Sequence, residues 1–162
     1  MNEDGELRGV GGWLAVFIVI VTAISPLYGV FQVYSSLYRG PLAGAGDFPV
    51  IATLRTFEWS LVGATALIGW FIAYRLIAVH NWTSVQIAIG GIWIASVGGA
   101  IAEFAGVSAI TGVGVDEIIA ESGPRGIIQP FIFGLIWTSY LLKSERVANT
   151  YRGGEEQAEV FE

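Results

Sequence analysis

The chain has 162 residues, of which more than half are apolar and only 14% are charged, and its formal net charge is −6. A soluble domain of this length needs more ionic groups on its surface, and a nucleic-acid-binding protein needs clustered Lys and Arg, so composition and charge argue against both classes. The sequence contains no cysteine, which excludes disulfide and thiol redox chemistry.

Long uncharged runs indicate membrane insertion. Thirty consecutive residues between Arg8 and Arg39 carry no ionisable group except tyrosine, and the twenty-two residues from Asn81 to Ala102 carry none at all. The hydrocarbon core of a bilayer, about 30 Å thick, is crossed by roughly 20 helical residues. We therefore expect an all-α, polytopic membrane protein with four transmembrane helices, surrounded by the lipid bilayer.

The first span is predicted over residues 13–34. Trp13 opens it and tyrosines close it, and both residue types favour the headgroup layer. Pro26 lies in its second half and removes a backbone hydrogen bond, so we expect the regular helix to kink or end there. Glycines and prolines over 40–49 predict a loop.

Three further spans are predicted over 56–74, 82–103 and 127–142. A glycine-rich segment separates the last two and is expected to contain a short interfacial helix over 115–121. The last span is short, but Lys143 at its end can extend its charge to the headgroups.

These spans define one membrane domain over 1–152, followed by an acidic, disordered tail over 153–162. Five of the eight basic residues fall on the side of the two termini. Basic residues beside spans favour the cytosolic side, so both termini are predicted to be cytoplasmic.

Small residues in the third span predict close helix packing. Gly91, Ala95 and Gly99 are spaced by four and share one helix face, where another backbone can approach. Glu103 is next in this series, and one interpretation is a carboxylate that handles a proton or cation inside the bundle. The alternative, favoured by its place at the end of the span, is an interfacial residue solvated by headgroups.

Arg55 and Glu58 are the second candidate pair. Their spacing of three places both on one face of the second helix, so a structural ion pair is the favoured interpretation. The alternative is a binding site for a cationic or protonatable ligand.

The sequence predicts neither a cofactor site nor a catalytic site. His80 is the only histidine and Met1 the only methionine, so the axial ligands of a haem are lacking. Neither a metal-ligand cluster nor a pairing of nucleophile and base is recognisable. We therefore expect no haem, no metal and no enzymatic activity.

Both ends of the chain resemble a known family. The segment 7–14, LRGVGGWL, is similar to the opening L-x-G-(I/V)-G-G-W-L of the bacterial domain-of-unknown-function 2569 family. The segment 136–151, IWTSYLLKSERVANTY, resembles that family's I-W-x-x-Y-(F/L)-x-x-S-x-R-V-x-N-T-(F/Y). Glu145 and Ala148 depart from the lysines that members often carry, so the cytosolic end is less basic than usual.

The resemblance implies a four-span protein of the bacterial inner membrane without an established activity. Its motifs add Trp13, Arg146 and Asn149 to the candidate functional residues. Our hypothesis is that Arg146, with Val147 and Thr150, docks on the turn 11–13 and closes the bundle at its cytosolic face. The rival hypothesis is that both motifs bind a protein partner.

Two functions follow from these observations. The first is a non-enzymatic accessory or assembly subunit of a membrane complex, bound to a protein partner. The second is a small transporter or channel subunit, acting as a homo-oligomer through Glu58, Arg55 and Glu103.

Overall fold

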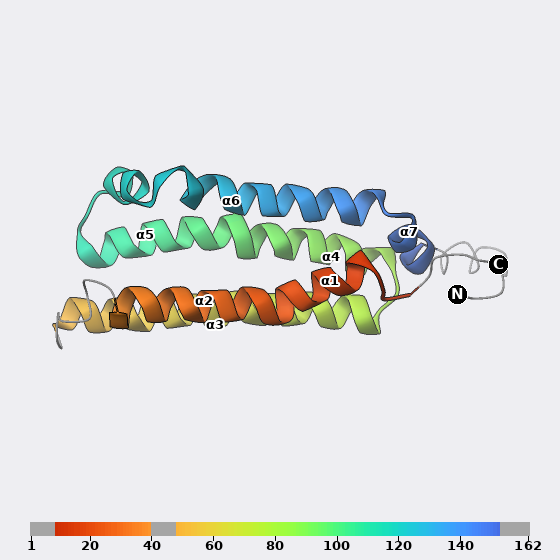
Figure 1. Ribbon diagram of the computed structural model, residues 1–162, viewed down its shortest axis with the longest axis horizontal. Coiled ribbons are helices and arrows are strands. Elements are labelled where there is room, and N and C mark those ends of the chain that lie inside the picture. The colour runs from red at the N-terminus through yellow and green to blue at the C-terminus, as the bar shows by residue number, and fades with distance from the viewer. Residues whose placement is uncertain (1–8, 40–47, 153–162) are drawn as a thin grey trace.

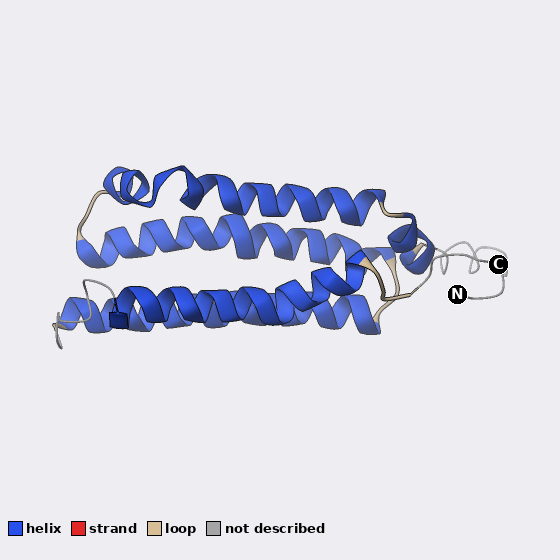
Figure 2. Cartoon of the chain, in the orientation of Figure 1, coloured by secondary structure: helices blue, strands red, loops and turns tan. Residues whose placement is uncertain are grey.

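The computed structural model describes residues 9–39 and 48–152. Within these ranges the chain forms helices joined by short turns, and it forms no strand (Figure 2). Most of the predicted loop over 40–49 and all of the predicted tail over 153–162 lie outside the described residues, as does Arg8.

The first long helix covers Trp13–Arg39 in four segments, which are α1 (Trp13–Val19), a π-helical turn η1 (Ile20–Ile24), α2 (Ser25–Tyr34) and a second π-helical turn η2 (Ser35–Arg39). Pro26 does not end this helix, in contrast to one of the two expected outcomes. Proline interferes with the carbonyl four residues earlier, which here is Thr22. That carbonyl oxygen accepts a hydrogen bond from Trp70 Nε1 of the next helix at 3.0 Å, so it remains satisfied.

The second and third long helices form a hairpin. Their segments are α3 (Pro49–Ala78), α4 (Trp82–Trp93), a π-helical turn η4 (Ile94–Gly98) and α5 (Gly99–Thr111). The Asn81 side chain caps α4 by accepting a hydrogen bond from Ser84 N at 3.0 Å. The third helix continues past Glu103 because the residues after it are apolar and the first terminating residue is Gly112, with φ 75°.

The last part of the chain forms α6 (Val115–Lys143) and the short α7 (Glu145–Tyr151). Gly123 adopts φ 66° and ψ −175°, which divides α6 into a short first piece and a long second piece. The first piece covers the predicted interfacial helix over 115–121. Ser144 starts α7 by accepting a hydrogen bond from Val147 N at 3.5 Å.

Three helices are long and apolar enough to cross a membrane, namely Trp13–Arg39, Pro49–Ala78 and Trp82–Thr111. Only 17%, 28% and 17% of the residues in their most apolar windows are buried, so most of their apolar surface faces outward, as it does toward lipid. The fourth predicted span, 127–142, belongs to α6, which is not among these three helices. Polar residues such as Gln129, Thr138 and Ser139 reduce its apolar character.

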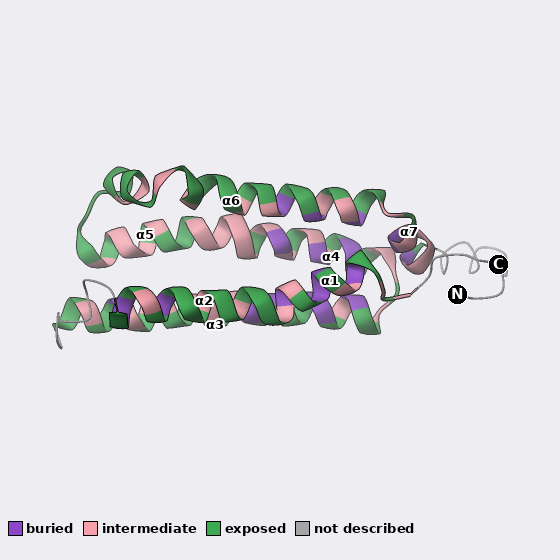
Figure 3. Cartoon of the chain, viewed as in Figure 1, coloured by how far each residue is buried: buried purple, intermediate pink, exposed green. Residues whose placement is uncertain are grey.

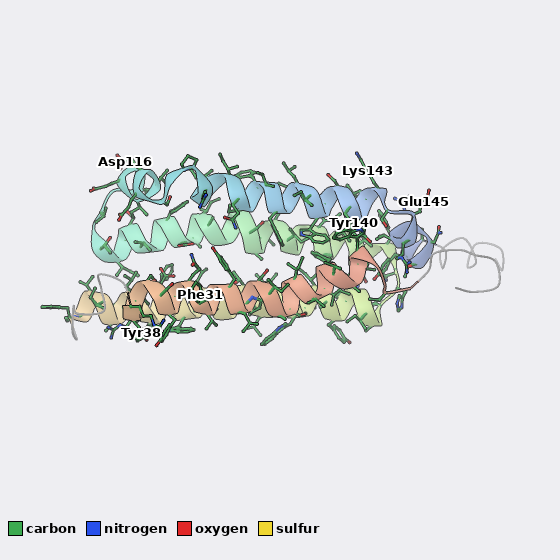
Figure 4. All side chains as sticks on the ribbon, viewed as in Figure 1. Phe31, Tyr38, Asp116, Tyr140, Lys143 and Glu145 are labelled. Atoms are coloured by element: carbon green, nitrogen blue, oxygen red, sulfur yellow. The ribbon has the colours of Figure 1, made fainter. Side chains whose placement is uncertain are left out.

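The helices pack as two antiparallel pairs, with α2 beside α3 and α4–α5 beside α6 (Figure 1). Contacts of α3 with α4 and α5 join the pairs. We call the end that holds Trp13 and α7 the terminal half, and the end that holds the α5–α6 turn the loop half. Figure 4 shows Asp116 at the loop end, far from Lys143 and Glu145 at the terminal end.

The main apolar core occupies the terminal half (Figure 3). Phe17 of α1 reaches Trp137 of α6 there, with 4.8 Å between ring centroids, and this contact closes the ring of helices. In the loop half, α2 and α6 are not among the elements that pack extensively against each other. The first long helix and α6 therefore meet through this ring contact in the terminal half, and a seam lies between α2 and α6 in the loop half.

Candidate functional site

A cavity of about 740 Å³ lies between the helices in the loop half, lined by η1, α2, α3, α4, η4, α5 and α6. This volume is in the range of small-molecule sites in proteins. Both a carboxylate and a guanidinium line it, along with several neutral polar groups. The main polar side chains of the cavity are Gln32, Thr65, Ser96, Glu103, Arg125 and Gln129.

The lining becomes more polar toward the loop end. The three candidate spans and α6 all run along the cavity, so each lines both of its ends. Each of these helices places an apolar residue on the terminal side and a polar residue on the loop side. The apolar residues are Val21, Ile72, Ile92 and Phe133, and the polar ones are Gln32, Thr65, Glu103 and Arg125. The cavity is thus apolar where it adjoins the main core, which we call its floor, and it carries the exposed residues Gln32, Glu103 and Arg125 toward the loop end.

Glu103 lies in this cavity and not at the end of its helix. The helix continues for two further turns to Thr111, so the reason for preferring an interfacial, solvated Glu103 no longer holds. Glu58 of α3 is close enough to Glu103 for the two carboxylates to interact electrostatically. Each lies within roughly 10 Å of the midpoint of its helix, at about 1.5 Å per residue.

Arg55 stands apart from these carboxylates. Its Cζ lies 5.2 Å from the ring centroid of Tyr38, a cation–π contact, and its Nε is buried without a hydrogen-bond partner within the described ranges. Among the described residues, no ion pair joins Arg55 to Glu58. The favoured interpretation of a structural ion pair was therefore wrong, since the guanidinium packs on an aromatic ring.

At least two of the three small residues of the third helix pack against α3. A Cβ on Gly91 would lie 2.7 Å from Ile72 Cδ1, and one on Gly99 would lie 3.6 Å from Thr65 Cγ2, so both glycines face α3. Ala95 lines the cavity instead. The π-helical turn η4 lies between the two glycines and changes the four-residue spacing on which the prediction relied.

The two terminal motifs meet at the terminal half. Arg146 lies against the opening turn, where a Cβ on Gly11 would be 2.9 Å from one guanidinium nitrogen. Gly9 N donates a hydrogen bond to Thr150 Oγ1 at 2.9 Å. The predicted docking geometry is thus present, but Trp13 is 68% exposed and does not take part in it. Asn149 is half-buried on the same helix as Arg146.

Tyr151 fixes α7 to the hairpin. It is fully buried, and its hydroxyl donates a hydrogen bond to the Leu76 carbonyl oxygen at 2.5 Å. Burial, with a smaller contribution from Tyr140, raises the pKa of Tyr151 to about 12. The His80 ring stacks on it with 5.8 Å between centroids. Tyr151 therefore belongs to the structural core of the terminal half.

Sequence reasoning missed three polar residues of the cavity, Gln32, Arg125 and Gln129. Arg125 was placed just before the last span, because the start of that span was expected at residue 127. Gln32 and Gln129 carried a usable signal, since each is an amide within a long apolar segment, where polar groups require partners. Among the described residues, no group of three His, Asp or Glu side chains could hold a metal ion.

Long apolar helices with outward-facing apolar side chains, arranged around a polar cavity, define a helical membrane protein. The chain belongs to the family described as "Protein of unknown function (DUF2569)", whose profile matches residues 7–152. No curated protein and no solved structure matches the chain.

Proposed function

We propose that this protein is a four-span protein of the bacterial inner membrane, with both termini in the cytoplasm, that binds a small ligand in the cavity around Glu103. In this proposal it binds and does not carry out covalent chemistry. The observation that carries the proposal is the presence of Glu103 and Arg125, on different helices, in one cavity between membrane helices. Charged side chains within a membrane bundle are costly and commonly mark functional sites.

The length and surroundings of α6 support the fourth span. Its long piece after Gly123 has about 20 residues, or roughly 30 Å, which is the thickness of the hydrocarbon core. It packs along α4 and α5, both parts of a candidate span. Its side chains Ile132, Leu135 and Ile136 are exposed on the outer surface, where lipid would cover them.

The packed terminal half favours binding over a channel. The cavity floor adjoins the main core, and Ile72 and Ile92 belong to both. An ion or solute in the cavity would have to displace this core to reach the terminal end. A transporter remains compatible with the cavity only if the terminal half opens in another conformation.

The second candidate is an accessory or assembly subunit. In this candidate function the two terminal motifs bind a protein partner. Arg146 and Thr150, however, already contact the opening turn of the same chain. Trp13, 68% exposed beside them, is the motif residue that a partner could contact. A stoichiometric partner in a gentle-detergent pull-down, lost in Trp13→Ala, would favour this candidate.

The ligand-binding proposal is tested by native mass spectrometry of the protein extracted from its own membranes. Ala100→Phe fills the cavity, and Ala102→Phe on the same helix is the control because Ala102 is exposed and does not line the cavity. We expect a small-molecule adduct on the wild type and on Ala102→Phe, and none on Ala100→Phe. An equal adduct on all three proteins, or none on the wild type, would contradict the proposal.

The topology is tested by single cysteines, since the chain contains none. A membrane-impermeant maleimide added to intact cells is expected to label Val113→Cys, at an exposed position in the α5–α6 turn, from outside. Ser144→Cys, before α7, is expected to react only after the cells are opened. The reverse pattern would invert the orientation, and labelling of both positions on the same side would remove the fourth span.

A further inference from the structure

The cavity has features that restrict its ligand, and the following inference rests on the proposed function. We propose that the ligand is an amphipathic zwitterion, which carries an ammonium group for Glu103, a phosphate or carboxylate for Arg125, and an apolar chain for the cavity floor. Three features of the cavity support it. These are the separate charges of Glu103 and Arg125, the change of its lining from apolar to polar, and the seam between α2 and α6.

The two charges of the cavity do not neutralise each other. Glu103 is on α5 and Arg125 is just after the Gly123 break in α6, and both line the cavity. Among the described residues, no ion pair joins them. A carboxylate accepts hydrogen bonds and a guanidinium donates them in a planar fork that fits phosphate or carboxylate. A ligand with both charges therefore satisfies both side chains.

A ligand with one charge satisfies only half of this site. A simple anion would pair with Arg125 but leave Glu103 without a counter-charge, and a simple cation would do the opposite. Glu103 lies within roughly 10 Å of the midpoint of its helix, where an unpaired charge is costly. Arg125 lies at the start of the long piece of α6, and its exposed guanidinium is available to an anionic group.

The apolar floor calls for a chain attached to the dipolar head. Val21, Ile72, Ile92 and Phe133 form the floor, on the terminal side of both charges. A fully polar zwitterion would leave this floor in contact with water or empty. An alkyl or acyl chain would fill this space and make van der Waals contacts with the four side chains. The middle of the cavity offers hydroxyl and amide groups, including Ser96 and Gln129, for the atoms that link head and chain.

The seam provides a route for such a molecule. In the loop half α2 and α6 do not pack extensively, whereas the other neighbouring helices do. A lipid can enter sideways between two helices without exposing its chain to water. A phospholipid with an ethanolamine head has the required chemistry, and a soluble molecule with the same head is the other possible source.

The test uses the full-length protein, purified in a non-ionic detergent, and three probes. Dihexanoyl phosphatidylethanolamine carries both charges and short chains, dihexanoyl phosphatidylglycerol carries the same chains with an anionic head only, and phosphoethanolamine is the dipolar head without chains. Dissociation constants are measured from the ligand-dependent shift of the unfolding midpoint. We expect the ethanolamine lipid to bind about tenfold tighter than either other probe, the difference expected for one charge-assisted hydrogen bond.

Variants locate the binding. Glu103→Gln and Arg125→Gln are each expected to weaken binding of the ethanolamine lipid about tenfold. Glu117→Gln and Lys143→Gln remove the same charges from exposed positions that do not line the cavity, and they should leave it unchanged. The comparison of the three probes on the wild type needs no variant, so the inference can be tested even if one charge variant fails to fold.

The outcomes separate this inference from the proposed function. Equal binding of the two lipids, abolished by Ala100→Phe, would overturn the zwitterion and leave a ligand-binding cavity. Phosphoethanolamine could instead bind as tightly as the ethanolamine lipid and be weakened by both charge variants. This result would uphold recognition of the dipolar head, and it would overturn a lipid as the ligand and the role of the apolar floor. No binding of any probe, with an adduct still present on the native protein, would overturn the inference alone. The absence of both would overturn the proposed function as well.

Discussion

The two halves of this bundle are built from the same helices but are packed differently. In the terminal half, α1, α3, α4, α6 and α7 enclose a core whose largest side chains, among them Phe17 and Tyr151, are fully buried. In the loop half the same long helices surround a cavity of about 740 Å³ with charged and amide groups. The buried cluster of the loop half is small and centres on Val33, Leu37 and Leu54.

The difference shows how one set of helices can combine rigidity with a binding site. The terminal half supplies the packing that membrane bundles need, because helices in lipid associate through close contact and hydrogen bonds and not through the hydrophobic effect. Gly69 lies where the two halves meet, since it lines the cavity and also brings the α3 backbone against the Val21 carbonyl. The loop half is then free to keep polar groups that a packed core would exclude.

The largest expected effect comes from emptying the core of the terminal half. Phe17→Ala removes a fully buried ring that contacts Trp137, and we expect it to lower the free energy of unfolding by about 3–5 kcal/mol. Phe31→Ala, on the same long helix in the loop half, removes a ring that is 62% exposed and should cost less than about 1 kcal/mol. Both are measured by SDS titration in mixed micelles. Similar losses of unfolding free energy in the two variants would mean that the two halves contribute equally to stability.

The next effect comes from adding volume to each half. Ala88 is fully buried in the terminal half, and Ala88→Phe should destabilise the protein by about 1–3 kcal/mol or more through overpacking. Ala100→Phe places the same group in the cavity and should leave stability nearly unchanged while it blocks the ligand site. If Ala100→Phe destabilised as much as Ala88→Phe, the loop half would be packed and not hollow.

Arg146 tests whether contact between the two ends of the chain stabilises the terminal half. Arg146→Ala removes the guanidinium that lies against Gly11 and Gly12, and we expect a loss of about 1–2 kcal/mol in detergent unfolding. Lys143→Ala removes a cation from an exposed position nearby and serves as the control. An Arg146→Ala protein as stable as the control would show that this contact does not hold the bundle closed.

Much of the helical architecture could be predicted from the sequence because it depends on long apolar runs. The three candidate spans coincide with predicted ones, and the family resemblance of the two ends is confirmed by the match over 7–152. Helix ends were less predictable. The third helix was predicted to end at its first charged residue, Glu103, although a glutamate does not end a helix. The helix ends instead before Gly112, which has a positive φ.

The candidate site could be predicted only in part, because it depends on which residues of different helices face each other. Glu58 and Glu103 were recognisable as charges within apolar segments, and they are close in space. Arg125 was not associated with them, since its approach depends on the Gly123 break and on the pairing of α5 with α6. The π-helical turn η4 was also hidden, because its residues differ little in composition from those of an ordinary helix.

The smallest effect concerns a hydrogen bond that joins α7 to the hairpin. Tyr151→Phe keeps the ring and removes the donor to the Leu76 carbonyl oxygen, so we expect a loss of about 1 kcal/mol near neutral pH. The control is Tyr74→Phe, which changes a tyrosine that is 62% exposed.

The wild type should also show a dependence on pH that this variant lacks. The pKa of Tyr151 is about 12 in the folded protein, against an ordinary value of 10.0, because burial disfavours the phenolate. Between these two values the unfolded chain releases the proton while the folded protein keeps it, so stability contributed by Tyr151 is complete below pH 10 and is lost as the pH rises toward 12. Unfolding titrations of the wild type, Tyr151→Phe and Tyr74→Phe across this window measure the difference. If the wild type and Tyr151→Phe lost stability in parallel, Tyr151 would be ionising as freely in the folded state as in the unfolded chain, and the terminal half would be less tightly closed around α7 than its packing indicates.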